Sequence, residues 1–215
     1  MNIFVLSTDA KKAARLMCNR HVVKMITESA QMMAVACKEV GVAEEDMPLT
    51  QKGTPWKGTA HVHHPCTRWV VSNYNNFLWL FTHAKELNRQ FRYRYDKAGV
   101  DHASMRAIQT MREAIFSKVS DAWDKGLPNA GPMSIEEPKT PFPRAFGDFE
   151  VHEDVPTVQA YRAYYNQKVF ADGKPMRWTS PSSTPHWYTG KGVDSILRAY
   201  FASKYFSVDL GGDEQ

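Results

Sequence analysis

The stretch CNRHVVKMITE holds a thiol, an imidazole, an ammonium and a carboxylate within the length of one short helix. His21, Lys24 and Glu28 follow steps of three and four residues, so on a helix they share one face, opposite an apolar stripe. One interpretation is a solvated surface with an ordinary Lys–Glu pair. The other is one wall of a cleft, in which Lys24 acts as an amine nucleophile and Glu28 moves protons.

A second group of candidates lies in the stretch HVHHPC. Cys66 follows Pro65 and opens a predicted helix, where the helix dipole lowers the pKa of a thiol. Cys66 is therefore a candidate nucleophile toward a pyrimidine, with His64 beside it as an acid or base. Alternatively, Cys18 and His21 join His64 and Cys66 as ligands of a tetrahedral zinc ion. A free cysteine is most often a small buried apolar residue.

The stretches RQFRYRY and YRAYY interleave arginines with aromatic residues. Guanidinium groups bind phosphates and aromatic rings stack on bases, so both stretches are candidates for contact with nucleic acid. In that interpretation Arg94 and Arg162 hold phosphate, while a tyrosine stacks on the base. The alternative is a helix end where the arginines cap carbonyl groups and the tyrosines pack. The nucleic-acid-binding candidates are Arg92, Tyr93, Arg94, Tyr95, Arg162 and Tyr164.

The apolar periodicity predicts the elements that have to position these side chains. Helices are expected over 10–17, 20–40, 65–95, 102–123, 158–170 and 193–206, with a short buried strand over 3–6. Residues 41–63 are expected to form a loop, 126–156 an irregular proline-rich crossing, and 209–215 a flexible tail. The predicted fold is mainly α, one compact multi-helix domain over 1–215. We expect the charged side of the second helix to face the start of the helix at Pro65.

Composition sets the broad class of the protein. The 215 residues are 43% hydrophobic and contain no apolar run as long as the ~18 residues of a membrane span. The amino-terminal stretch turns polar too early for a signal peptide, so a cytoplasmic protein is expected, without membrane contact. The net charge of +4 permits a polyanionic partner. No glycine-rich phosphate loop or dinucleotide fingerprint is present, so no cofactor is expected besides the zinc alternative. The oligomeric state is left open.

The chain resembles a family of short proteins of tailed bacteriophages. The resemblance rests on MNIFVLSTD, CNRHVVKMITESAQMM, HPCTRWV, NYNNFLWL, YRYDK, YRAYYNQK and RW, in this order. Members are sometimes labelled as similar to pyrimidine dimer DNA glycosylases, which are small helical enzymes. A phage protein of this kind would act in the cytoplasm of the host cell.

The resemblance implies a glycosidic-bond cleavage in which an amine attacks C1′ of a nucleotide, aided by a glutamate. The Met1 amine or Lys24 would be the nucleophile, and Glu28 the acid or base. Asn19 and Arg20 stand where the family often has Asp and Lys, which weighs against a catalytic role for that turn.

Three hypotheses follow for the function. The first is a DNA- or nucleotide-processing enzyme of the glycosylase type. The second is a pyrimidine-modifying transferase that depends on Cys66. The third is a binding protein without catalysis, either plain or stabilised by zinc, that acts on a host factor.

Overall fold

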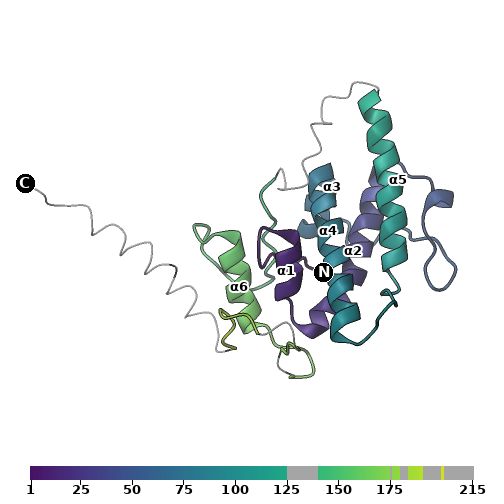
Figure 1. Ribbon diagram of the computed structural model, residues 1–215. Coiled ribbons are helices and arrows are strands. Elements are labelled where there is room, and N and C mark those ends of the chain that lie inside the picture. Colours follow the sequence, from purple (N-terminus) through teal and green to yellow (C-terminus); the bar gives the residue numbers. More distant parts are fainter. Residues whose placement is uncertain (125–139, 175, 180–183, 191–199, 201–215) are drawn as a thin grey trace, which may run out of the picture.

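The computed structural model describes residues 1–124, 140–174, 176–179, 184–190 and 200, and in this part the protein is a compact, mainly helical molecule, as predicted. In Figure 1, α5 and α6 stand at opposite sides, with α1, α2 and α4 between them. The helices are α1 (Ala10–Leu16), α2 (Asn19–Glu39), α3 (Pro65–Ser72), α4 (Tyr74–Arg94), α5 (Met105–Asp124) and α6 (Thr157–Gln167), with a short 3₁₀ helix η1 (Glu44–Asp46).

Helix α2 is the centre of the packing. It contacts α3, α4 and α5, and α4 in turn packs against α1. Most residues along α2 are buried, and they include polar side chains of the face that carries His21 and Glu28. Glu28, for example, is 8% exposed. On the charged side of α2, His21 and Glu28 are therefore buried, whereas Lys24 stays exposed.

The helix boundaries follow the local signals in the sequence. Asp9 caps α1 by accepting a hydrogen bond from the Lys12 N–H, and Pro65 occupies the first turn of α3, where its missing N–H costs nothing. Helix α2 matches the predicted range 20–40 to within one residue at each end. Residues 41–63 form the expected loop, apart from η1.

The predicted helix over 65–95 is wrong in one respect, because the structure divides it into α3 and α4. Asn73 lies between them in an extended conformation, with φ −158° and ψ 140°. Its side-chain oxygen accepts a hydrogen bond of 2.8 Å from the Asn75 N–H, which caps α4. Asparagine competes with the helix in this way because its short amide reaches the backbone. The apolar periodicity continues across the break and conceals it.

The strand predicted over 3–6 is not present. Phe4 has a positive φ of 42°, and the Leu6 N–H donates to the Phe4 carbonyl at 2.7 Å, which forms a tight turn. No neighbouring strand pairs with this segment among the described residues. Side chains take the place of a strand partner: the Phe4 N–H donates to Asn2, and Arg162 donates to the Leu6 carbonyl. Continuous burial of an apolar run thus does not imply pairing.

The described part of the proline-rich crossing, 140–156, is irregular, as expected. Its earlier part, together with the predicted helix over 193–206 and the tail 209–215, lies outside the described residues. Among the described helices, none is long and apolar enough to span a membrane.

The cap at Asn73 yields a test of the helix break. Replacing the cap, Asn73→Ala, removes the acceptor of the Asn75 N–H, and the free energy of unfolding should fall by about 1 kcal/mol. Asn73→Asp keeps an acceptor in the same place, so its free energy of unfolding should fall much less. Urea denaturation of the three proteins measures the difference. Equal losses in both variants would contradict the capping role.

Candidate functional site

The carboxylate of Glu28 lies at the centre of the candidate site. Its Oε2 accepts a hydrogen bond of 2.8 Å from the backbone N–H of Asn2, and its Oε1 lies 3.3 Å from the ammonium nitrogen of Lys24. Glu28 is buried, whereas the Lys24 side chain is 66% exposed. The acid is thus fixed between an amino-terminal backbone group and a cation that reaches in from the surface.

The amino terminus and His64, at the start of α3, lie within electrostatic range of this carboxylate. Burial lowers the pKa of His64, the positive amino terminus lowers it further, and Glu28 opposes both. The Met1 side chain is held by a contact of 3.3 Å from the Thr67 hydroxyl to its sulfur. An amine, a carboxylate and an imidazole therefore meet where the amino-terminal segment crosses between α2 and α3.

Cys66 lies near the same place, yet its thiol is not a nucleophile in this fold. The residue is 0% exposed, and burial raises the pKa of its thiol to about 12. The expected lowering by the helix dipole is outweighed because a thiolate is poorly solvated in an apolar interior. The sequence prediction for Cys66 failed because exposure, not helix position, decides the ionisation here.

His21 is turned away from the candidate site. Its ring stacks on Phe4 with centroids 4.4 Å apart, and a hydrogen bond of 2.8 Å joins its Nδ1 to the hydroxyl of Tyr165. Burial, assisted by the charges of Lys168 and Lys24, lowers the pKa of His21 to about 3. A neutral, 1% exposed imidazole cannot exchange protons with a substrate at neutral pH. The structure assigns it to packing.

The zinc alternative finds no support in the geometry. Among the described residues, no group of three or more His, Cys, Asp or Glu side chains is placed to hold a metal ion. The four proposed ligands have other surroundings: Cys18 and His21 adjoin Tyr165 at the start of α2, and the Nδ1 of His64 accepts the Cys66 N–H at 3.2 Å.

The two arginines expected to hold phosphate cap carbonyl groups instead. Arg94 donates to the Met17 and Arg15 carbonyls at the end of α1, at 2.7 and 2.9 Å. Arg162 donates through Nε and Nη2 to the Leu6 carbonyl. Burial lowers the pKa of both guanidinium groups. Their donors satisfy buried backbone oxygens, a role that the spacing of the arginines does not reveal.

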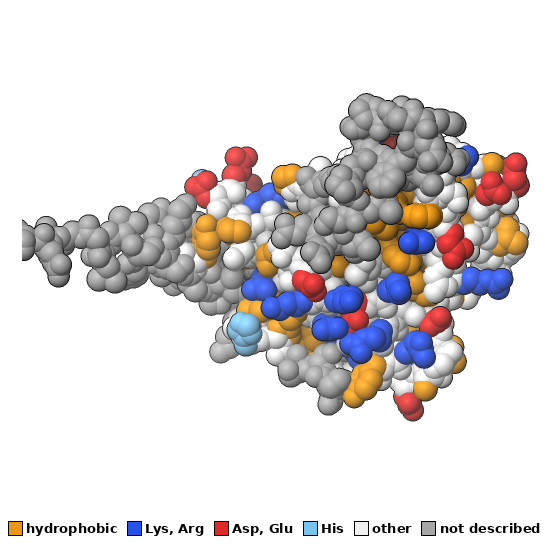
Figure 2. Space-filling model, turned by 45° about the horizontal axis from the view of Figure 1, so that its top comes forward, with side chains coloured by type: hydrophobic (Ala, Val, Ile, Leu, Met, Phe, Trp, Pro, Cys, Tyr) orange, Lys and Arg blue, Asp and Glu red, His pale blue; other side chains and the backbone are white. Residues whose placement is uncertain are grey.

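The other candidates at the end of α4 are more exposed. Arg92 lies 3.6 Å from Asp101, and the Tyr95 hydroxyl donates to the Asn19 carbonyl. Tyr93 is 60% exposed. Figure 2 shows lysine and arginine side chains gathered on one face of the molecule, with fewer acidic side chains among them.

Tyr164 belongs to a column of nearly parallel rings. It stacks on Phe149 with centroids 5.6 Å apart and on Phe4 at 6.2 Å, and Phe4 continues the column to His21. The ammonium of Lys168 lies 5.3 Å from the centre of the Tyr164 ring. Tyr164 and Phe149 are half-buried, so this end of the column is partly exposed to solvent.

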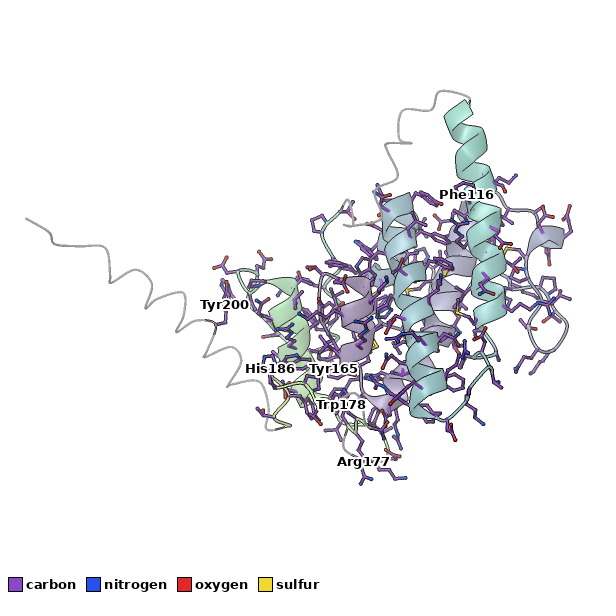
Figure 3. The ribbon with its side chains drawn as sticks, in the orientation of Figure 1. Phe116, Tyr165, Arg177, Trp178, His186 and Tyr200 are labelled. Carbon is purple, nitrogen blue, oxygen red and sulfur yellow. The ribbon has the colours of Figure 1, made fainter. Side chains whose placement is uncertain are left out.

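Sequence reasoning missed Asn2 and Tyr165. Asn2 binds Glu28 through its N–H and the Ala145 carbonyl through its side chain, at 2.6 Å. The Tyr165 hydroxyl accepts the Cys18 N–H at the start of α2, and its ring lies near Trp178 (Figure 3). Neither role is visible in local sequence spacing, because Glu28 is 26 positions from Asn2, and Ala145 and Tyr165 are 143 and 147 positions from Asn2 and Cys18.

Residues 1–98 match the model of a protein family described as pyrimidine dimer DNA glycosylase. This segment is pyrimidine dimer glycosylase-like. The match spans Glu28, Lys24, His64 and the amino terminus, whereas α5 and α6 lie beyond it. No curated protein and no solved structure matches the chain. The glycosylase-like label given from the sequence is confirmed.

The burial of all three cysteines generates a prediction about their reactivity. In the folded protein a thiol-reactive disulfide reagent at neutral pH should titrate none of them rapidly, because each is buried. All three should react once the protein is denatured. Rapid, selective labelling of Cys66 in the folded state would contradict the inert thiol and revive the cysteine-dependent transferase.

The low pKa of His21 makes stability depend on pH. Above pH 6.5 the imidazole is neutral in both states and contributes nothing. As the pH falls from 6.5 toward 3, the unfolded chain binds a proton that the folded protein does not, so the free energy of unfolding falls by about 1.4 kcal/mol per pH unit. The variant His21→Asn keeps a polar atom near Tyr165 and should show a shallower fall. Urea denaturation at several pH values between 7 and 4.5 measures both slopes, and parallel curves would refute the assignment.

Proposed function

We propose that the protein is a DNA glycosylase of the pyrimidine dimer type, with the Met1 α-amine as nucleophile and Glu28 as acid and base. The observation that carries the proposal is the 2.8 Å hydrogen bond from the Asn2 N–H to Glu28, which holds residue 1 beside a buried carboxylate. The match of residues 1–98 to the pyrimidine dimer DNA glycosylase family supports the same substrate class.

The geometry favours the amino terminus over Lys24 as the nucleophile. Lys24 forms an ion pair with Glu28, and as a cation it has no electron pair to donate. The Met1 amine adjoins the Asn2 N–H that is bound to the carboxylate, so it lies close to the acid that would move protons. In this assignment Lys24 is a positioning residue that orients Glu28.

The reaction then runs through an imine. The amine nitrogen attacks C1′ and the glycosidic bond breaks, with its electron pair leaving on the base, which takes up a proton. Opening of the sugar ring at O4′ gives a protonated imine between the amine and C1′. Glu28 removes a proton from C2′, and the electron pair expels the 3′ phosphate, which cuts the strand. His64 stands beside the carboxylate as a second proton carrier.

The ring column supplies a place for a base near this centre. Asn2 binds the carbonyl of Ala145, and Phe146, the next residue, contacts Tyr164 with ring centroids 5.7 Å apart. An extruded base that stacks on the partly exposed end of the column would have Lys168 beside it. In this proposal Tyr164 would stack on the base, and Lys168 rather than Arg162 would be the nearby cation.

Reduction with borohydride tests the proposal directly. The wild-type protein, incubated with a duplex that contains one pyrimidine dimer, should form a covalent adduct that peptide mapping locates at residue 1. Lys24→Ala should still form the adduct, since the lysine is not the nucleophile. Glu28→Gln should bind the duplex but cut it at least ~100-fold more slowly, because the proton transfers are lost.

An undamaged duplex of the same sequence and a melting curve for each variant serve as controls. An adduct mapped to Lys24 would overturn the assignment of the amine. A wild-type protein that binds DNA but never forms an adduct would overturn the imine mechanism and favour a binding protein without catalysis.

A further inference from the structure

A cavity of about 410 Å³ lies between α1, α4 and α5. It is lined by Lys11, Leu78, Phe81, Lys85, Arg89 and Arg112, with Thr82 and Glu86 at its edge. These side chains come from three helices, so the cavity depends on the packing of the bundle and not on one helix end. Of the basic residues, Arg89 belongs to the stretch RQFRYRY, whereas Lys11, Lys85 and Arg112 lie outside the stretches that the sequence singled out.

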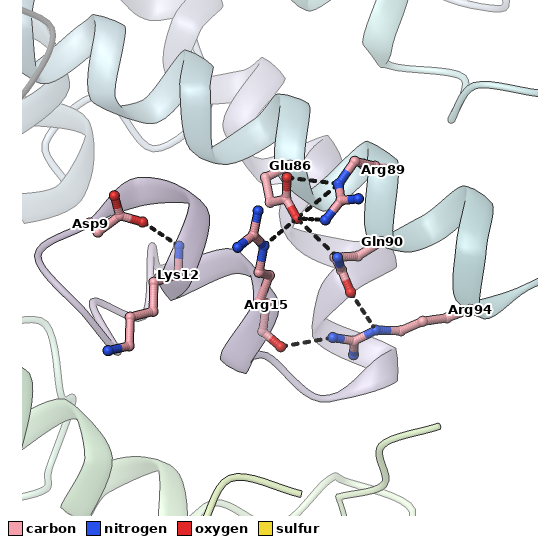
Figure 4. Close-up of polar contacts among 7 residues, drawn as sticks. All are labelled: Asp9, Lys12, Arg15, Glu86, Arg89, Gln90 and Arg94. Carbon is pink, nitrogen blue, oxygen red and sulfur yellow. Dashed lines mark hydrogen bonds and ion pairs between the residues drawn. The ribbon is translucent and has the colours of Figure 1, made fainter. Parts of the chain in front are cut away.

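The one acidic residue that lines this cavity is already neutralised. Glu86 is 6% exposed and accepts hydrogen bonds from Arg15, Arg89 and Gln90, at 2.8–3.1 Å (Figure 4). Burial by itself would raise the pKa of Glu86, but these hydrogen bonds lower it below the ordinary value. The carboxylate thus stays ionised and orients two guanidinium groups, and it leaves a net positive charge around the cavity.

The floor of the cavity is apolar and aromatic. The ammonium of Lys85 lies 5.6 Å from the centre of the Phe81 ring, and the guanidinium of Arg112 lies 5.9 Å from it. Arg112 also lies over Phe116, at 5.0 Å. These contacts hold the two cations close to one ring, and no acidic side chain in the described part of the chain forms an ion pair with either, so their charge is available to an anion.

We infer that this cavity binds the backbone phosphates of a nucleic acid strand. The inference rests on the proposed function, which supplies a polyanionic ligand, and it adds a contact region formed by Lys11, Lys85, Arg89 and Arg112. Cations around an apolar floor suit the alternating phosphates and sugars of a nucleic acid backbone, and phosphate contacts position a nucleic acid without reading its bases. The contact positions DNA irrespective of its sequence.

The salt dependence of DNA binding tests this inference. Lys11→Ala combined with Lys85→Ala should weaken binding to an undamaged duplex, and the slope of log affinity against log salt should become shallower by about 2, roughly one unit for each lost phosphate contact. Lys52→Ala combined with Lys97→Ala is the matched control. It removes the same charge from exposed positions outside the cavity and should leave the slope unchanged.

The outcomes separate the inference from the proposed function, since binding to undamaged DNA needs no chemistry. Equal slopes in the two double variants would overturn the inference even if the wild type forms the borohydride adduct. A cavity variant with the shallower slope supports it even if no adduct forms. Pyrophosphate that raises the melting temperature only when Lys11 and Lys85 are present, with no change in duplex binding, would assign the cavity to a small phosphate ligand and overturn it.

Discussion

The amino-terminal segment crosses the interior without a strand partner, and its backbone groups therefore need hydrogen bonds from side chains elsewhere. Unsatisfied buried backbone groups cost as much as a lost hydrogen bond, which makes this a strict requirement. Glu28 and Arg162 meet it from distant parts of the chain, and the Asn2 side chain meets it from within the segment. The candidate active site is a direct product of that solution, because the carboxylate that satisfies the Asn2 N–H is also the one that faces the amino terminus.

The same requirement explains why several charged residues serve structure and not ligand binding. Arg94 and Arg162 donate to backbone carbonyl oxygens of the amino-terminal region, so their guanidinium groups are engaged within the protein. Other basic side chains, among them Lys11, Lys85 and Arg112, line the cavity between α1, α4 and α5. Positive charge in the sequence thus divides into an internal set that completes hydrogen bonding and an external set that is open to anions.

The sequence predicts the helical class and most helix ends, since caps and apolar periodicity are local properties. Of the side chains predicted to share a site, Lys24 pairs with Glu28, whereas His21 is buried in aromatic packing and burial raises the pKa of the Cys66 thiol. The break at Asn73 is hidden because periodicity runs through it. The partners of Asn2 and Tyr165 lie far away in the chain, and no spacing rule within one sequence reveals them.

The hydrogen bond between Tyr165 and the first turn of α2 has a consequence for how the chain is divided. Residues 1–98 carry the family similarity, but Asn2 needs Ala145, Leu6 needs Arg162, and the Cys18 N–H needs Tyr165. Each of these contacts joins the segment that matches the family to a residue beyond position 98. Ala145, Arg162 and Tyr165 therefore stabilise residues 1–98. Without them, the amino-terminal segment and the start of α2 would lose these hydrogen bonds.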